Sequence, residues 1–514
     1  MLAAVAIGAN FWGFPVYILD EAKNAACSWE MFQRGDWVTP TFNGVLRTDK
    51  PPLHYYFMML SYGAFGVSAW SARLFSIVMG LLTVAAVYHF SRRMAGAGTA
   101  FWSGMVLVCS MFFIVEFHLA VPDPYFIFFL TIGWLSFAYA WQTGRSGYYY
   151  LSYAAVALAF LAKGPAAIVL SGAAYAAFIV LRGEFKWSVF KRVKLMAGLG
   201  VFLLIAAPWW IAAALQTKGE WVRGFILEHN VGRFSAPYED HGNLPGMTIL
   251  FLLVALLPLS VYLPVALARG WKERRENALV FMCVACTLIV LLFFSISRTL
   301  LANYVGPAVP VGAILVGWAI DRRLATFTES GGWQKWSALV IAIILIGLVP
   351  VLRAVISGDR WIGDLPSLAW LFLPISAAAW AAAGFIWANH LRLALFSWLV
   401  GFWLSGVMLF YIGAPQIFAR NPVSRSVALV EGSQDEVIGY RFFNAAYVFN
   451  LQRTFVTFWD MNDLLRYCRG RSVMILSRDE DREVLEAAGF RIVFECPYLF
   501  EGSTALVLTG PEAR

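Results

Sequence analysis

The chain has 514 residues, of which 60% are hydrophobic and only 14% are charged, and its formal net charge is +8. A soluble domain averages about 45–50% apolar and about 25% charged residues, so this composition excludes the soluble globular class and indicates a membrane protein. The positive charge does not indicate nucleic-acid binding, because the Lys and Arg residues lie in short loops between apolar segments, where they are expected to set membrane orientation.

The apolar runs predict a polytopic α-helical membrane protein with about thirteen transmembrane helices. A spanning helix needs about 20 mostly apolar residues. The expected spans lie near residues 1–17, 69–90, 99–117, 124–141, 148–162, 165–181, 195–216, 247–268, 277–296, 301–320, 336–352, 367–388 and 393–413. The first span is short, but it has neither a basic leader nor a small-x-small cleavage site, which disfavours a cleaved signal peptide.

The loops between these spans separate by charge. One alternate set is rich in Lys and Arg, and the positive-inside rule makes this set cytoplasmic. It contains Arg92, Arg93, Arg145, Arg182, Lys186, Lys191, Arg192, Lys194, Arg269, Lys272, Arg274, Arg275, Arg322, Arg323, Lys335 and Arg392. The opposite set holds most of the acidic loop residues and includes two long outer loops, at 18–68 and 217–246. We therefore expect a transmembrane domain over residues 1–414, with its long loops outside.

Residues 415–514 lack long apolar runs, and their pattern predicts a small periplasmic α/β domain. Short apolar runs at 427–430, 472–476, 491–494 and 504–508 are typical of strands. Segments 460–467 and 479–488 are predicted helices, whose acidic residues are interpreted as caps and solvated turns. Cys468 and Cys496 of this domain could pair in an oxidising compartment, a question that the sequence leaves open. Cys283 and Cys286 form a CxxC, but the surrounding apolar run predicts a spanning helix and not a zinc site.

Several motifs follow one another along the outer loops. The first is Asp20-Glu21 after the first span, which alone could be a solvated helix cap. The others are Gly35–Gly44 (GDWVTPTFNG), Asp49–Tyr55 (DKPPLHY), Leu119–Pro124 (LAVPDP) with Phe160–Pro165 (FLAKGP), and Glu228–Phe234 (EHNVGRF). Taken together, in this order, they resemble the bacterial aminoarabinose transferase family. More distantly, they resemble the protein O-mannosyltransferases of the same multi-spanning superfamily.

Two departures from the family pattern concern the residues beside these motifs. The aminoarabinose enzymes usually follow the Asp-Glu pair with Arg-Tyr, where this chain has Lys23-Asn24. Their acidic-Lys pair is usually Glu-Lys, and here it is Asp49-Lys50. The general machinery is present, but the sugar and the acceptor need not be aminoarabinose and lipid A.

The resemblance implies transfer of a sugar from undecaprenyl phosphate by an inverting displacement. Such a reaction needs a carboxylate near the acceptor and cations near the departing phosphate. By analogy with the family, Asp20 is the catalytic carboxylate. Lys50 and Lys163 are the expected phosphate ligands, although Lys163 could instead be a snorkelling lysine at a helix break.

The remaining candidates are assigned to substrate binding. Asp123 could hold sugar hydroxyls or order Lys50, or be a turn residue. Tyr55 could stack on sugar or belong to an interfacial aromatic belt. The full predicted substrate-binding set is Glu21, Asp49, Lys50, His54, Tyr55, Asp123, Lys163, His229 and Arg233.

No cofactor or metal is predicted. The chain has no Walker loop and no nucleotide-binding glycine fingerprint. His241 follows Glu239 and Asp240, but three contiguous residues cannot easily ligate one ion, so a solvated loop is the better interpretation.

The leading hypothesis is therefore an inner-membrane glycosyltransferase whose site faces the periplasm. Its expected partners are a polyprenyl-phosphate-linked sugar and an acceptor, most plausibly lipid A or lipopolysaccharide. The alternatives are protein glycosylation of the O-mannosyltransferase kind and, from another class, a flippase of lipid-linked sugars. A transporter should place its charges along a mid-membrane channel, whereas an enzyme should gather them in one outer cavity.

Overall fold

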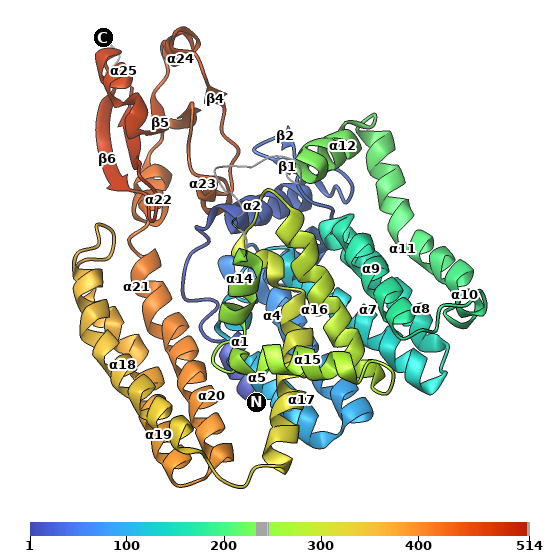
Figure 1. Cartoon of the computed structure of the whole chain (residues 1–514). Helices are drawn as coiled ribbons and strands as arrows, with labels where there is room; N and C mark the ends of the chain where they lie inside the picture. The colour runs from blue at the N-terminus through green and yellow to red at the C-terminus, as the bar shows by residue number, and fades with distance from the viewer. Residues whose placement is uncertain (233–243, 245, 511–514) are drawn as a thin grey trace.

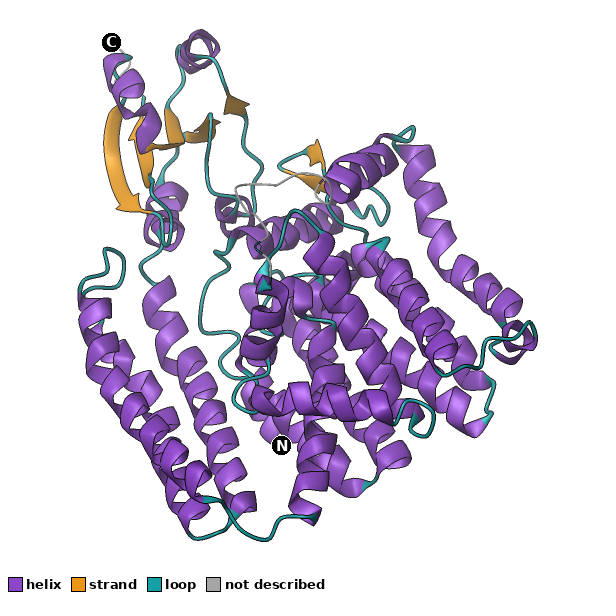
Figure 2. Ribbon diagram, in the orientation of Figure 1, coloured by secondary structure: helices purple, strands orange, loops and turns teal. Residues whose placement is uncertain are grey.

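The computed structural model of the chain describes residues 1–232, 244 and 246–510. Helices dominate the body, and a small sheet lies at one end of it (Figures 1 and 2). The first half contains α1 (Leu2–Ile7), α2 (Leu19–Arg34), β1 (Thr41–Phe42), β2 (Val45–Leu46), α3 (Leu53–Phe65), α4 (Ala69–Ala95), α5 (Ala97–Cys109), α6 (Met111–Glu116), α7 (Asp123–Thr143), α8 (Gly147–Lys163), α9 (Ala166–Leu181), α10 (Ser188–Arg192), α11 (Leu195–Gln216), α12 (Glu220–Arg223) and the π-helical segment η1 (Gly224–Gly232).

The second half completes the helical body and adds the C-terminal sheet. Its helical elements up to residue 432 are α14 (Met247–Ala255), η2 (Ser260–Tyr262), α15 (Leu263–Lys272), α16 (Ala278–Ile296), η3 (Ala302–Val305), α17 (Ala308–Ala325), α18 (Gly332–Ser357), η4 (Pro366–Phe372), α19 (Leu373–Trp387), α20 (Leu391–Met408), η5 (Leu409–Gly413), α21 (Ala414–Phe418) and α22 (Pro422–Gly432). Then follow β3 (Glu436–Tyr440), α23 (Ala446–Leu451), β4 (Thr457–Phe458), α24 (Met461–Cys468), β5 (Val473–Arg478), η6 (Asp479–Asp481), α25 (Arg482–Ala487), β6 (Arg491–Pro497) and β7 (Thr504–Thr509).

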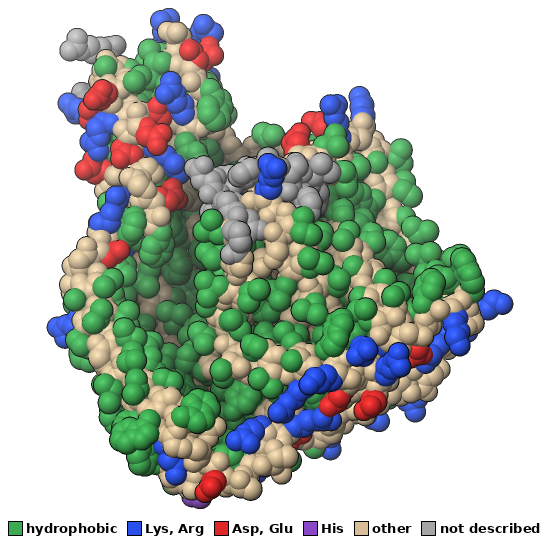
Figure 3. Space-filling model, viewed as in Figure 1, with side chains coloured by type: hydrophobic (Ala, Val, Ile, Leu, Met, Phe, Trp, Pro, Cys, Tyr) green, Lys and Arg blue, Asp and Glu red, His purple; other side chains and the backbone are tan. Residues whose placement is uncertain are grey.

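Seven helical segments of the described chain are long and apolar enough to cross a membrane, so the chain is a polytopic membrane protein. They are Ala69–Ala95, Asp123–Thr143, Leu195–Gln216, Ala278–Ile296, Gly332–Ser357, Pro366–Trp387 and Leu391–Phe418. Side chains on their outer faces are largely hydrophobic, as the space-filling view shows over the flank of the body (Figure 3). The total of thirteen spans stays a prediction.

Several of the expected spans are not single helices. Within residues 1–17 only Leu2–Ile7 is helical, and turns follow from Gly8. The expected 99–117 span is divided at Ser110 into α5 and α6. The expected 247–268 span ends as α14 at Ala255, and α15 then runs across the body instead of along it (Figure 1). Pro258 lies between these two helices, where a proline cannot continue the hydrogen-bond ladder.

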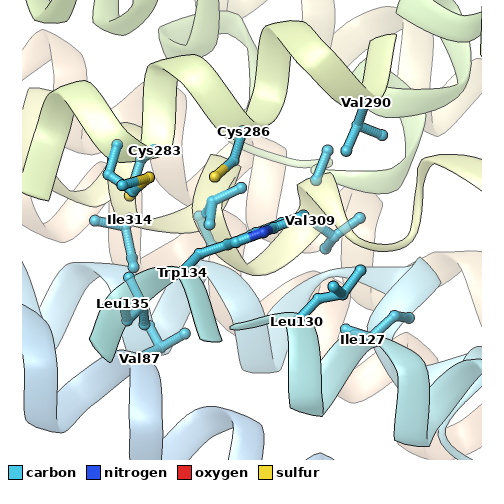
Figure 4. Close-up of a cluster of buried hydrophobic side chains, with 14 of the residues drawn as sticks. Val87, Ile127, Leu130, Trp134, Leu135, Cys283, Cys286, Val290, Val309 and Ile314 are labelled. Carbon is cyan, nitrogen blue, oxygen red and sulfur yellow. The ribbon is translucent and has the colours of Figure 1, made fainter. Parts of the chain in front are cut away.

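The core of the body lies where α4, α7, α16 and α17 meet. Trp134 of α7 reaches from its helix toward the α16 side chains, and its indole nitrogen donates to Ser171 at 3.1 Å (Figure 4). Cys283 and Cys286 of α16 are fully buried in this apolar cluster and carry free thiols. The CxxC is therefore part of a packed apolar core, as the hydrophobic run around it predicts.

The C-terminal residues form a five-stranded mixed sheet with the order β4-β3-β5-β7-β6. Strand β3 is parallel to β4 and β5, whereas β7 is antiparallel to both β5 and β6. The strand expected at 427–430 is wrong, because these residues lie in helix α22. Asn421 caps this helix by accepting from the Ser424 amide at 2.7 Å. Cys468 and Cys496 are both free, so the disulfide left open by the sequence is not formed.

The sheet is joined directly to the region that holds the site. Helix α2 crosses one end of the bundle and packs against α23 (Figure 1). The Asn43 side chain and the Phe455 backbone exchange two hydrogen bonds, at 2.9 and 2.7 Å. The Leu499 amide donates to the Tyr17 hydroxyl at 3.0 Å. The C-terminal residues thus hold both ends of the segment that contains α2.

Candidate active site

A cavity of about 530 Å³ opens where the ends of α2, α7 and α8 meet η1 and the end of α16. Its lining combines charged groups with a long apolar wall. The polar lining residues are Asp20, Asp49, Lys50, Asp123, Lys163, His229, Ser297, Asn303 and Tyr304. The apolar ones are Pro122, Phe126, Pro165, Ala166, Val169, Phe225, Ile226, Phe293, Phe294, Leu301 and Pro307. Such a lining suits a ligand that has an ionic head and a hydrocarbon tail.

Asp20 presents an exposed carboxylate to this cavity from the first turn of α2. The helix begins after Ile18 without a side-chain cap, so Asp20 is not the capping residue that an isolated acidic pair suggests. Among the described residues Asp20 has no hydrogen-bond or ion-pair partner, unlike the other two carboxylates of the cavity.

Asp123 and Lys163 form an ion pair at the junction of α7 and α8, with 2.5 Å between Oδ1 and Nζ. Both side chains are mostly buried, and the ammonium also lies 5.5 Å from the centre of the Tyr304 ring. Helix α8 ends at Gly164, which has a φ of +82°. A Cβ added there would lie 2.5 Å from the Phe225 ring, so the position has no room for a side chain. This turn holds Lys163 at the cavity wall beside Asp123.

Asp49 is held by two neighbouring side chains. Its Oδ2 is 3.2 Å from Nε of Arg47, and its Oδ1 is 2.8 Å from Nε2 of His229. Burial opposes ionisation of Asp49, but the hydrogen bond from His229 and the charges of Arg47 and Lys50 hold the pKa of this carboxyl well below its usual range. Asp49 is therefore a fixed anion next to Lys50.

Three residues predicted to bind substrate do not line the cavity. Glu21 is buried against Arg73 instead, in a fork with distances of 2.7 and 2.8 Å, and it also accepts from the Ala120 amide. His54 and Tyr55 are fully buried between α3 and α2, where His54 Nε2 lies 3.3 Å from the Asn24 side-chain oxygen. Burial, with the charges of Arg47 and Lys50, lowers the pKa of His54. All three residues therefore lie in the packed interior next to the cavity and not on its surface.

The other predicted residues divide between the cavity and the undescribed segment. Asp20, Asp49, Lys50, Asp123, Lys163 and His229 line one cavity, and this grouping is the arrangement that the enzyme hypothesis predicts. Their chemical roles stay predictions. Arg233 and the Glu239–His241 run lie outside the described residues. Within the described chain, no group of three or more His, Cys, Asp or Glu side chains is placed to hold a metal ion.

Several residues of the site were not indicated by any motif. Arg73 uses all five of its N–H donors, on Glu21 and on the carbonyls of Phe11, Phe14 and Pro15. Glu116 is a buried carboxylate within electrostatic range of Asp20, Asp123 and Lys163. Ser297, Asn303 and Tyr304 are the further polar lining residues. An Arg or Glu inside an otherwise apolar run is the one signal that could have found Arg73 and Glu116.

Comparisons with known proteins find relatives of this chain. Residues 49–211 match the family described as dolichyl-phosphate-mannose-protein mannosyltransferase. A Pseudomonas aeruginosa undecaprenyl phosphate-alpha-4-amino-4-deoxy-L-arabinose arabinosyl transferase is 27% identical over 476 residues, which cover 88% of this chain and 82% of that protein. An uncharacterized protein of Aquifex aeolicus is 31% identical over 343 residues, which cover 65% of this chain but only 64% of that protein.

Solved structures share the fold. ArnT from Cupriavidus metallidurans, in a crystal structure bound to undecaprenyl phosphate, superposes with a TM-score of 0.82 at 20% identity, over 99% of this chain and 98% of that one. The archaeal oligosaccharyltransferase AglB from Archaeoglobus fulgidus superposes with a TM-score of 0.56 at 10% identity, over 94% of this chain and 69% of that one. The chain is thus an aminoarabinose transferase-like glycosyltransferase, whose residues 49–211 match the dolichyl-phosphate-mannose-protein mannosyltransferase family.

Proposed function

We propose that this enzyme transfers a sugar of the aminoarabinose type from undecaprenyl phosphate to lipid A or another part of lipopolysaccharide. The Pseudomonas and Yersinia relatives are named for transfer from undecaprenyl phosphate-aminoarabinose. The observation that carries the proposal is the cavity itself. One open carboxylate, two lysines and an apolar wall lie together in it, which matches a sugar, a phosphate and a prenyl chain joined in one molecule.

Asp20 is the proposed catalytic carboxylate. It is the exposed carboxylate of the cavity, and it lies on α2, within a segment that the C-terminal residues contact at Tyr17 and at Asn43. When the acceptor is a hydroxyl, Asp20 takes its proton as the acceptor oxygen attacks the sugar carbon. When the acceptor is an ionised phosphate, no proton need be removed, and Asp20 then stabilises the positive charge that develops on the sugar ring.

Lys50 and Lys163 are the proposed ligands of the lipid phosphate. Both line the cavity, and a compact ammonium suits a phosphate oxygen. Asp123 keeps the Lys163 ammonium at the wall before the donor arrives, because the two groups are already paired. The departing phosphate gains negative charge as the sugar leaves, so these cations stabilise the transition state more than the ground state.

The proposed location is the bacterial inner membrane, with the cavity and residues 415–514 in the periplasm and residues 1–414 as the membrane domain. Charge supports this orientation. Lys and Arg side chains form a band along the edge of the body that carries α10 and α15, far from the C-terminal sheet (Figures 1 and 3). Such a band is typical of a cytoplasmic face.

The test is a comparison of cells with and without the gene. Mass spectrometry of lipid A and of periplasmic proteins should show a sugar that is lost from lipid A on deletion and restored by the wild-type gene. Loss of a sugar from secreted proteins, with lipid A unchanged, would replace this proposal with protein glycosylation. Lipid-linked sugar that accumulates with both products unchanged would point to a flippase.

A further inference from the structure

Three side chains contact one another in a row at the cavity, where Asp49 and His229 line the wall and Arg47 lies behind Asp49. Arg47 contacts Asp49 at 3.2 Å, and Asp49 contacts His229 at 2.8 Å. Arg47 and Asp49 precede α3, whereas His229 lies about 180 residues later in η1. A carboxylate on one ring nitrogen of a histidine is the arrangement by which proteins orient an imidazole for use at its other nitrogen.

The two segments are fixed to one another by contacts other than this ion pair. The Trp221 indole nitrogen donates to the Arg47 carbonyl at 2.8 Å. At the start of η1, a Cβ on Gly224 would lie 2.8 Å from the Thr48 side chain, so the two backbones pack closely. The Arg47 amide in turn donates to the Pro40 carbonyl at 2.9 Å. The imidazole of His229 is therefore held in place without a substrate.

The second ring nitrogen of His229 is the unexplained atom. Nε2 is engaged by Asp49, which leaves Nδ1 for another group. Within the described part of the chain, Nδ1 is buried and has no hydrogen-bond partner, although the residue lines the cavity. A buried polar atom without a partner lowers stability, so its presence beside a binding cavity points to a partner that arrives with the substrate.

The leaving group of the proposed reaction needs such a partner. The donor is a phosphodiester with one negative charge, and cleavage of its bond to the sugar leaves a phosphate monoester with a second one. A phosphate monoester takes up a proton with a pKa of about 6, so a proton delivered during cleavage lowers the charge that develops. Lys50 and Lys163 can balance charge at the phosphate, but neither is as good a proton donor near neutral pH as a histidine.

We propose that His229 is the general acid that protonates the departing lipid phosphate, and that Asp49 is its positioning residue. This inference rests on the proposed function. The bond between the sugar carbon and the phosphate oxygen breaks, and its electron pair stays on that oxygen. The oxygen takes the proton from Nδ1 of the doubly protonated imidazole, while the acceptor oxygen forms the new bond to the sugar carbon. The neutral imidazole is reprotonated from water before the next turnover.

Charged groups of both signs surround His229. Asp49 is in contact with it, and Asp20 and Asp123 line the same cavity. Lys50 and Lys163 also line this cavity, and Arg47 lies behind Asp49. Glu228 is adjacent in sequence and exposed. A general acid works only while protonated, so the rate of sugar transfer should fall as the pH rises.

The experiment measures the single-turnover rate across a range of pH with undecaprenyl phosphate-aminoarabinose and lipid A. His229→Asn keeps an N–H near the position of Nδ1 but cannot release the proton. It should lose about 10²- to 10⁴-fold in rate, the usual contribution of a general acid, and it should lose the fall in rate at high pH. The affinity of this variant for undecaprenyl phosphate alone should stay within a few-fold of the wild-type affinity. Such binding also serves as the control that the variant is folded.

Two further variants make the test specific. Asp49→Asn keeps the size of the side chain but removes the carboxylate that contacts Nε2 at 2.8 Å, so the rate should fall while its decrease at high pH remains. His89→Asn is the matched control, because His89 is an exposed residue of α4 and should leave the rate and the pH profile unchanged.

The outcomes separate the two proposals. A wild-type rate and pH profile for His229→Asn would overturn the assignment, as would equal losses of rate and of undecaprenyl phosphate binding with the high-pH fall retained. A wild-type protein that binds undecaprenyl phosphate but transfers no sugar would refute the proposed function itself.

Discussion

The buried pair of Glu21 and Arg73 yields a prediction that separates support of the site from substrate binding. Glu21 accepts from two guanidinium nitrogens and from the Ala120 amide, three residues before Asp123. The Arg73 side chain is completely buried, so water cannot replace the lost partner in Glu21→Gln. Removing one partner of a buried ion pair costs roughly 3–5 kcal/mol. We therefore expect this variant to lose about that much free energy of unfolding.

The assay is unfolding in mixed micelles, with the free energy extrapolated to zero denaturant. Asp463→Asn is the matched control, because its pair with Arg466 is exposed and should contribute less than about 1 kcal/mol. The double variant Glu21→Gln, Arg73→Met should lose less than the sum of the single losses, since it leaves no buried charge alone. Unchanged stability in Glu21→Gln, together with lost binding of undecaprenyl phosphate, would refute this reasoning. Glu21 would then be assigned to substrate binding.

Three other predictions follow from the contacts of the outer region. Lys50→Ala should weaken undecaprenyl phosphate binding about 10- to 150-fold, as measured by titration. This range corresponds to the loss of one hydrogen bond to a charged group, which is worth roughly 1.5–3 kcal/mol. Asn43→Ala breaks both bonds to Phe455, so limited proteolysis should cut residues 422–510 faster than in wild type; equal rates would contradict the docking role. Protease added to intact spheroplasts should cleave this C-terminal region, and cleavage only after the cytoplasm is opened would overturn the proposed orientation.

Sequence patterns predicted the helical body well, because long apolar runs have few alternatives in a membrane protein. They failed where the signal was short. The run at 427–430 is four apolar residues long, a length that periodicity alone cannot assign to strand or helix. The signals that decide it are Asn421 and Pro422, a capping residue followed by a proline at the first helical position. Helix α14 likewise ends before Pro258, although the apolar run continues beyond it.

The residues of the candidate site also fall into those that the sequence indicated and those that it did not. Motifs selected Asp20, Lys50 and Lys163, which line the cavity, because charged residues beside helix ends stand out in an apolar chain. Their roles stay predictions. The motifs did not distinguish which of the neighbouring polar residues face the cavity. Glu21 follows Asp20 directly, but adjacent helix positions point in different directions, so one is exposed and the other is buried. Arg73 was missed because its partner is 52 residues away, a contact that spacing cannot reveal.

The role of Asp20 is tested most directly by one pair of measurements on Asp20→Asn, which keeps the size of the side chain and removes its charge. Donor binding and sugar transfer to lipid A should be measured on the same purified variant and on wild type. The account predicts undecaprenyl phosphate affinity close to wild type, because Lys50 and Lys163 remain, and transfer reduced to background. Transfer at the wild-type rate would contradict it, and Asp20 would then be an ordinary exposed residue in the first turn of α2.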